Sequence, residues 1–253
     1  MLKQRIISAL VMIPLPLLIV YLGNPWFALT GALLGVAMAW EWQQMLENKC
    51  DVYALFLAGS ASISTLLSLV CPIAPFMVVF FASIIFFAIF NQDSTKLKIF
   101  GFFYISLPLV SLVWLRSNFD FAYVLWIIGV VLATDIGGYV FGCSIRGPLL
   151  LPSISPKKTW AGLIGGMLLA ALTGFAYAKL AGKEEIWFAG VSAFLAVISQ
   201  VGDFFESGVK RRLGKKDSSN LIPGHGGIFD RIDGLLFVAP AVAIFQGIKI
   251  IIT

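Results

Sequence analysis

Nine long apolar segments constrain this chain more than any other feature of its sequence. They cover residues 5–22, 25–41, 52–70, 73–91, 99–115, 121–142, 159–178, 186–206 and 234–252. Each is close to the ~20 residues that a helix needs to cross a hydrocarbon core of ~30 Å. In lipid, a single segment can satisfy its own backbone hydrogen bonds only as a helix. The sequence therefore predicts an all-α integral membrane protein with about nine transmembrane helices.

The composition supports this prediction. Only 12% of the 253 residues are charged, against about 25% in a typical soluble domain, and the mean hydropathy is +0.94. Lys3 and Arg5 precede the first apolar run, as they would in a signal peptide. We interpret the run as a retained first helix, because it is long and Pro25 lies where a cleavage site would be sought.

Lysine and arginine are distributed unevenly between the segments that connect the predicted helices. If the N-terminus is cytoplasmic, 14 of the 18 basic residues lie on the cytoplasmic side. This bias favours a cytoplasmic N-terminus and a C-terminus on the opposite side. The net charge of +5 comes mostly from these basic residues on the cytoplasmic side. It is therefore not evidence for a nucleic-acid partner.

The chain divides by polarity into two parts. Residues 1–95 form apolar helices with short connections, and we interpret their acidic residues, Glu41 among them, as an ordinary solvated linker. Residues 96–253 contain the unusual polar residues and are predicted to form the catalytic part. The loops 143–158 and 207–233 fall on the same predicted side of the membrane and can therefore build one site together.

Asp135 is a carboxylate within a predicted transmembrane helix. At the centre of such a helix it would cost ~2.5–3.5 kcal/mol on insertion scales. It is therefore a candidate contact for a metal or a substrate, and the alternative is a structural ion pair. Gly138 and Gly142 predict a helix-packing surface, as do Gly162 and Gly166 in the next segment.

Lys157 and Lys158 precede the seventh predicted helix. Ser155 has the position of an N-cap and Pro156 that of the first helical residue. The two lysines are then expected at the positive end of the helix dipole, which suits an anion. The alternative is that they only anchor the helix on the cytoplasmic side.

Two groups of acidic residues follow near the C-terminus. Asp203, Ser207 and Lys210 share one face of the eighth predicted helix, and Glu206 can pair with Lys210. Asp230 and Asp233 share a face at the start of the ninth. Oxygen ligands of this kind suit Mg²⁺, and the alternative is that the two aspartates only stabilise the helix N-terminus.

The segment Gly224-His225-Gly226-Gly227 precedes the second acidic group. Its glycines allow the backbone to approach a phosphate without obstruction by a Cβ atom. His225 is the only histidine. It is a candidate for positioning a ligand or for acting as a general base.

These residues together resemble the signature of the phosphatidate cytidylyltransferase family. The signature-like run is Ser207-x2-Lys210-Arg211-x4-Lys216-Asp217-x5-Pro223-Gly224-His225-Gly226-Gly227-x2-Asp230-Arg231-x-Asp233. Residues 134–139, 155–160 and the pair Gly202-Asp203 also resemble the family. One departure is Ala161, where the family usually carries Glu, and it puts the role of residues 155–162 in doubt.

The resemblance implies that the chain transfers CMP from CTP to phosphatidate, with Mg²⁺, in a bacterial inner membrane. It implies an all-helical membrane fold and a homodimer. Asp203, Asp230 and Asp233 are the expected ligands of one or two metal ions. Asp203, Lys210, Arg211, Asp230 and Asp233 are the expected catalytic residues. The expected substrate-binding residues are Asp135, Lys157, Lys158, Ser207, Lys216, His225, Gly226, Gly227 and Arg231.

Two other functions are compatible with parts of the pattern. A CTP-dependent lipid kinase of the polyprenol kinase type would use similar groups. An ion-coupled transporter could use Asp135, but its polar residues should line a transmembrane path. A CDP-alcohol phosphotransferase is excluded, because Asp233-Gly234 is not followed by the Ala-Arg of that motif.

Overall fold

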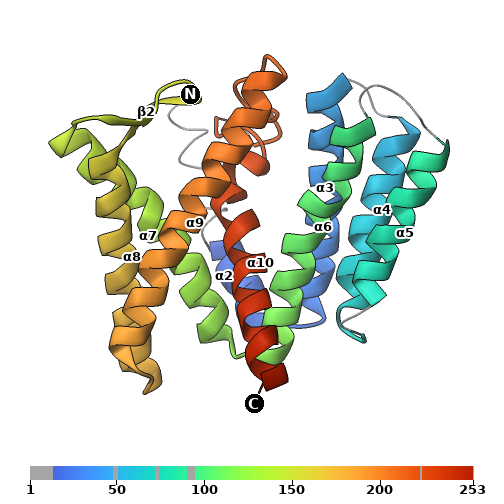
Figure 1. Cartoon of the computed structure of the whole chain (residues 1–253). Helices are drawn as coiled ribbons and strands as arrows, with labels where there is room; N and C mark the ends of the chain where they lie inside the picture. Colours follow the sequence, from blue (N-terminus) through green and yellow to red (C-terminus); the bar gives the residue numbers. More distant parts are fainter. Residues whose placement is uncertain (1–13, 48–50, 72–73, 90–94, 223, 253) are drawn as a thin grey trace.

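The computed structural model describes residues 14–47, 51–71, 74–89, 95–222 and 224–252 (Figure 1). Within these residues the chain forms nine helices and one two-stranded hairpin. The elements in chain order are α2 (Pro14–Leu22), α3 (Trp26–Glu47), α4 (Val52–Leu67), α5 (Ala74–Ile89), α6 (Thr95–Asn118), α7 (Phe121–Ile145), β1 (Leu149–Leu151), β2 (Ser155–Thr159), α8 (Trp160–Ala181), α9 (Glu185–Arg212) and α10 (Phe229–Ile252).

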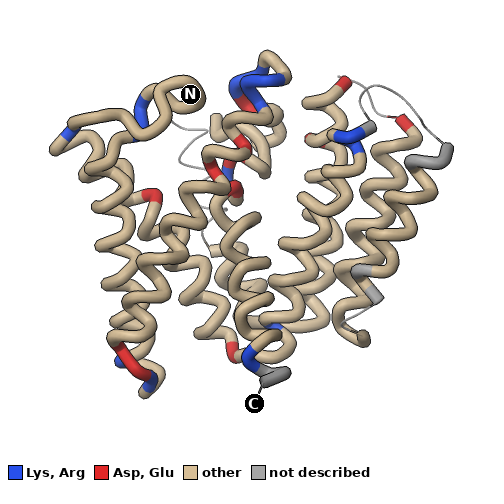
Figure 2. The backbone as a smooth tube through the Cα atoms, in the orientation of Figure 1, with Lys and Arg blue, Asp and Glu red and all other residues tan. Residues whose placement is uncertain are grey.

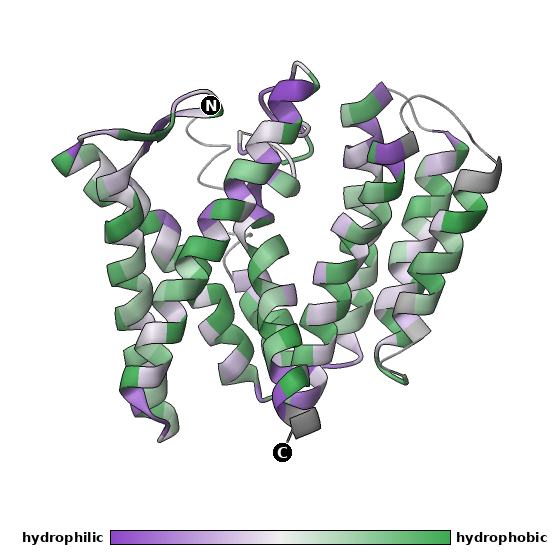
Figure 3. Cartoon of the chain, in the orientation of Figure 1, coloured by the Kyte–Doolittle hydropathy of each residue, from purple (hydrophilic) through white to green (hydrophobic). Residues whose placement is uncertain are grey.

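The prediction of an all-helical membrane protein is confirmed. Where the structure describes them, the predicted apolar segments coincide with helices; residues 5–13, 73, 90 and 91 of these segments lie outside the described residues. Five described helices, α6 to α10, are long and apolar enough to cross a membrane. Helix α4 and the part Met77–Phe86 of α5 are apolar but shorter. Hydrophobic residues predominate in the middle of the helices (Figure 3), and most charged residues lie toward the helix ends (Figure 2).

Helix α10 joins two packed groups of helices and lies between them in Figure 1. Phe229 and Leu236 belong to a core built with α3, α4, α5 and α6. Val238 and Val242 belong to a second core, built mainly with α7, α8 and α9. Because one helix contributes to both cores, the position of its N-terminus is tied to both groups.

Small residues let α7 and α8 approach closely. A Cβ atom on Gly137 would lie 2.5 Å from the carbonyl oxygen of Gly165, and one on Gly166 would lie 2.9 Å from that of Thr134. A Cβ atom on Gly162 would lie 2.8 Å from the carbonyl oxygen of Gly138. The predicted helix-packing role of Gly138, Gly162 and Gly166 is confirmed, and Gly137 adds a close contact that was not predicted.

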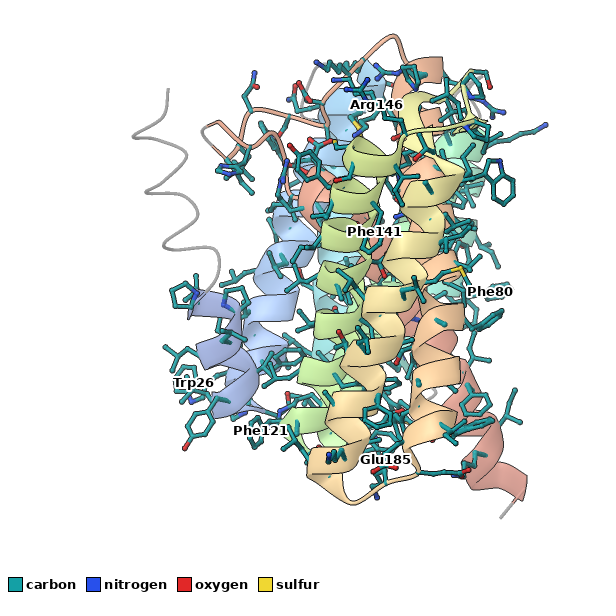
Figure 4. All side chains as sticks on the ribbon, turned by 90° about the vertical axis from the view of Figure 1, so that its left-hand side faces the viewer. Trp26, Phe80, Phe121, Phe141, Arg146 and Glu185 are labelled. Atoms are coloured by element: carbon teal, nitrogen blue, oxygen red, sulfur yellow. The ribbon has the colours of Figure 1, made fainter. Side chains whose placement is uncertain are left out.

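Helix α7 begins at Phe121 at one end of the bundle, and its C-cap residue Arg146 lies at the other end (Figure 4). The hairpin that follows and the 213–228 segment lie at that same end (Figure 1). The two polar connections are shorter than predicted, because α7 continues to Ile145 and α9 to Arg212. The last turn of α9 carries Lys210, Arg211 and Arg212. Cations at this position are stabilised by the negative end of the helix dipole.

The predicted start of the helix after the hairpin is wrong. Ser155 to Thr159 form β2, which pairs antiparallel with β1, so Ser155 is not an N-cap and Pro156 is not the first helical residue. Thr159 is the N-cap, and its Oγ1 accepts from Gly162 N at 3.1 Å. Pairing with β1 uses the strand backbone, and proline is tolerated in such an edge position. Lys157 and Lys158 therefore precede the helix and project from a strand.

Replacement of Gly137 by valine should destabilise the α7–α8 contact. The new side chain would meet backbone atoms of Gly165 and Gly166, and overpacking of this kind costs about 1–3 kcal/mol. Thermal unfolding of detergent-purified protein should show a lower midpoint than wild type. Gly190→Val on α9 is the matched control, because a Cβ atom there meets nothing within 4 Å. Equal midpoints for the two variants would contradict this packing.

Candidate active site

Three helices bring carboxylates toward the end of the bundle that carries the hairpin. Asp135 comes from α7, Asp203 from α9 and Asp233 from α10. The three negative charges interact with one another electrostatically, and Lys158 and Arg231 act on Asp135 with the opposite sign. Asp135 is exposed, whereas Asp203 and Asp233 are partly buried. A concentration of negative charge in an apolar protein is costly without a cationic ligand or partner.

The hairpin contributes one lysine to this group. Lys158 forms an ion pair with Asp203, and its Nζ lies 4.7 Å from the centre of the Phe204 ring. Its neighbour Lys157 is exposed, because successive side chains of a strand point to opposite faces. Asp203 lies on α9, before the predicted connection 207–233, so this pair joins the hairpin to α9. The meeting of the two polar connections stays a prediction.

Lys210 joins α9 to the start of α10. Its Nζ lies 2.5 Å from a carboxylate oxygen of Glu206 and 2.5 Å from Oδ1 of Asp230, and all three side chains are buried. The predicted pairing of Glu206 with Lys210 is confirmed. Ser207 donates to Asp203 at 3.3 Å, as their shared helix face predicted. Lys210, in contrast, contacts Asp230 rather than Asp203.

The second oxygen of Asp230 is also fully used within the protein. Oδ2 accepts from the backbone N of Ser218 at 2.9 Å, from Ser218 Oγ at 2.9 Å and from Gly227 N at 2.8 Å. Gly226 has a φ of +82°, and a Cβ atom there would lie 2.6 Å from this oxygen. Glycine at 226 is therefore required by the protein itself.

A tight turn precedes these contacts. Ile222 N donates to the carbonyl oxygen of Gly226 at 2.8 Å, and His225 N donates to that of Ile222 at 2.9 Å. The carbonyl oxygen of His225 accepts from Arg231 Nε at 2.9 Å. His225 Nδ1 is buried and has no hydrogen-bond partner among the described residues. The turn therefore orients the side chain of Arg231 and leaves one imidazole nitrogen available.

Several predicted phosphate-binding cations remain exposed around this group. They are Lys157, Arg211, Lys216 and Arg231, and none of them forms an ion pair with a residue that the structure describes. Exposed cations next to a cluster of carboxylates suit a ligand that carries phosphate groups and a divalent metal.

Glu41 is a further residue that the sequence interpretation assigned wrongly. It does not belong to a solvated linker, because it is fully buried on α3. It accepts from Ile228 N at 2.8 Å, from Phe229 N at 3.1 Å and from Ser219 Oγ at 2.6 Å. A carboxylate inside an apolar stretch of 22 helical residues was the signal that could have revealed it.

Tyr104 of α6 was also not predicted. Its hydroxyl is buried and has no hydrogen-bond partner among the described residues. Asp203, Glu206 and Asp233 act on it electrostatically, and its ring stacks on Phe229 at 5.6 Å. A hydroxyl in this position is available to donate to a ligand near the carboxylates.

The described residues contain no group of three or more His, Cys, Asp or Glu side chains arranged to hold a metal ion. Mg²⁺ commonly uses only one or two carboxylates and completes its shell with water and substrate phosphates. Asp203 and Asp233 fit that requirement. Asp230 is further restricted by Lys210, Ser218 and Gly227, so its predicted role as a metal ligand stays a prediction.

Comparison with known proteins identifies the family of this chain. The family model described as "Cytidylyltransferase family" matches residues 3–248. A phosphatidate cytidylyltransferase of Brucella suis is 34% identical over 253 residues, covering 98% of this chain and 94% of the relative. One from Rickettsia bellii is 30% identical and covers 80% of this chain and 94% of the relative. One from Staphylococcus aureus is 41% identical over 120 residues, 47% of this chain and 46% of the relative.

Removing the buried ammonium of Lys210 should destabilise the fold strongly. In Lys210→Met, Glu206 and Asp230 stay buried without their cation, and breaking such a pair costs about 3–5 kcal/mol. Unfolding of purified protein in mixed detergent micelles, followed by circular dichroism, measures the loss. The control Lys157→Met removes an exposed lysine and should unfold with wild type. Similar stability for both variants would contradict the assigned network.

Proposed function

This chain belongs to the cytidylyltransferase family, and we propose that it converts CTP and phosphatidate into CDP-diacylglycerol and pyrophosphate. The observation that carries the proposal is the meeting of Asp135, Asp203 and Asp233, from three helices, with Lys158 and Arg231 at one end of a membrane-embedded bundle. Carboxylates for a metal and cations for phosphates are the groups that phosphoryl transfer requires. The lipid phosphate can reach them from the bilayer.

In the proposed reaction, a phosphate oxygen of phosphatidate attacks the α-phosphorus of CTP in line. A new P–O bond forms, the bond between the α-phosphorus and the bridging oxygen breaks, and pyrophosphate leaves with that electron pair. A phosphomonoester has a second pKa near 6, so the nucleophile is already largely ionised at neutral pH. His225 is therefore assigned to ligand positioning through its turn.

The chain's own residues then supply position and charge. We assign the exposed cations Lys157, Lys216 and Arg231 to the phosphate oxygens, with Arg231 oriented by the carbonyl oxygen of His225. Arg211 lies on the same segment and can bind a second phosphate. Asp135 lies on the exposed side of the carboxylate group and is assigned to substrate contact. Lys158 limits the repulsion that Asp203 would otherwise exert on a phosphate.

We propose that Mg²⁺ is held by Asp203 and Asp233 together with substrate oxygens. The ion would neutralise the charge that develops on the phosphates during transfer. Asp230 could join the metal only by giving up its contacts with Ser218 or Lys210. Its described contacts instead favour a role in holding Lys210 and the start of α10 in place.

We propose that the site faces the cytoplasm of a bacterial cell, from the inner membrane. The support is the basic-residue bias, with 14 of 18 lysines and arginines assigned to that side, and the cytoplasmic location of CTP. The same bias supports a cytoplasmic N-terminus and, with the nine spans that the apolar segments predict, an external C-terminus. We also propose that the protein is a homodimer, as the family resemblance implies.

A labelling experiment tests the reaction directly. Detergent-purified protein with phosphatidate, Mg²⁺ and CTP labelled at the α-phosphate should yield labelled lipid, and chelation of Mg²⁺ should abolish the product. CTP labelled at the γ-phosphate should label pyrophosphate only. Lipid labelled from the γ-phosphate would identify a lipid kinase instead. Ion flux in proteoliposomes without any turnover of CTP would favour the transporter.

A further inference from the structure

A carboxylate from the N-terminal part of the chain holds the start of α10. Glu41 is 0% exposed, and its two oxygens accept from Ile228 N at 2.8 and 2.9 Å and from Phe229 N at 3.1 Å. These are backbone groups at a helix N-terminus, which lack partners within the helix. Glu41 therefore caps α10 from a different helix, 187 residues away in sequence.

Within the part of the chain that the structure describes, Glu41 is held by hydrogen-bond donors rather than by a lysine or arginine. None of the ion pairs between described residues includes Glu41. Its partners are backbone N–H groups and the hydroxyls of Ser218 and Ser219. A buried carboxylate held by several N–H groups at the positive end of a helix is strongly oriented. Glu41 therefore fixes the helix start in position and in direction.

The same contacts lead directly to the candidate site. Ser218 Oγ lies 3.4 Å from Glu41 and 2.9 Å from Asp230, whose other oxygen binds Lys210. The N–H group of Gly227 goes to Asp230, while those of the next two residues go to Glu41. Glu41 and Asp230 thus hold three successive N–H groups between them. A shift of this segment would move Arg231 and Asp233, which follow within one turn.

Gly227 makes this arrangement possible. A Cβ atom at this position would lie 2.0 Å from Ser218 Oγ and 2.4 Å from Glu41 Oε1. Only glycine lets the backbone approach the carboxylate so closely. The contacts within the protein therefore require glycine at position 227, whether or not a phosphate binds nearby. Helix α3, which carries Glu41, makes a second contact with this part of the chain. The carbonyl oxygen of Gln44 accepts a hydrogen bond from Lys215 Nζ.

We propose that Glu41 is a positioning residue for cytidylyl transfer. Acting through Ser218 and the N–H groups of residues 228 and 229, it sets the position of Arg231 and Asp233 against Asp203. The N-terminal helices then contribute to the catalytic geometry as well as to the scaffold. This inference rests on the proposed function, and it predicts a local change that can be measured without turnover.

The test compares Glu41→Gln with Glu47→Gln. Glutamine keeps the size of the side chain but turns an NH₂ group toward N–H donors. We expect kcat/KM for CTP to fall by about 10²-fold, the scale on which misplacement acts, with a raised KM for CTP. Glu47 lies on the same helix and pairs with Lys98 of α6, so its variant should keep the wild-type KM. If the variant merely contained less folded protein, the apparent kcat would fall and the KM for CTP would stay at the wild-type value.

Hydrogen exchange supplies the readout that does not depend on activity. In Glu41→Gln, the amides of residues 227–229 should exchange faster, while those of α7 and α8 keep their wild-type rates. Wild-type exchange and wild-type KM in an active enzyme would overturn the inference and leave the proposed reaction standing. If the wild-type protein itself shows no cytidylyl transfer, the proposed reaction is wrong. Should Glu41→Gln not fold, Ser218→Ala removes the hydroxyl that lies between Glu41 and Asp230 and must show the same two changes.

Discussion

The candidate site depends on the buried ion network in which Lys210 holds Glu206 and Asp230 together. Three charged side chains in an apolar bundle are stable only when each has partners, because the cost of desolvation is high. Lys210 forms ion pairs with both carboxylates, and the backbone N–H groups of Ser218 and Gly227 donate to the remaining oxygen of Asp230. This network connects α9 to α10 at the point where the reacting groups would have to meet.

Around that network, the protein separates two kinds of acidic residue. Glu41 and Asp230 are surrounded by donors from their own chain and fix the segment before α10. Asp135, Asp203 and Asp233 repel one another and are compensated only partly, by Lys158 and Arg231. The first group builds the structure of the site. The second keeps an excess of negative charge, which suits a metal that arrives with a phosphate ligand.

Much of this arrangement could be predicted from the sequence, because apolar length determines the helices and short spacing determines neighbours on one helix. The pairs Asp203–Ser207 and Glu206–Lys210 follow from a separation of four residues. The contacts of Glu41 could not be predicted in this way, since they depend on how α3 packs against a segment far away in sequence. The β2 strand was missed because Ser155-Pro156 also satisfies the local rules for a helix start.

The most direct test of the account is the location of bound nucleotide. A cryo-electron microscopy structure of the protein in lipid nanodiscs, with Mg²⁺ and a non-hydrolysable CTP analogue, would supply it. The account predicts that the triphosphate lies between β2 and the start of α10, within contact of Lys157 or Arg231 and next to Asp203 and Asp233. Nucleotide bound instead at the opposite end of the bundle, in the cavity of about 620 Å³ beside Tyr123, Lys183 and Lys249, would contradict it.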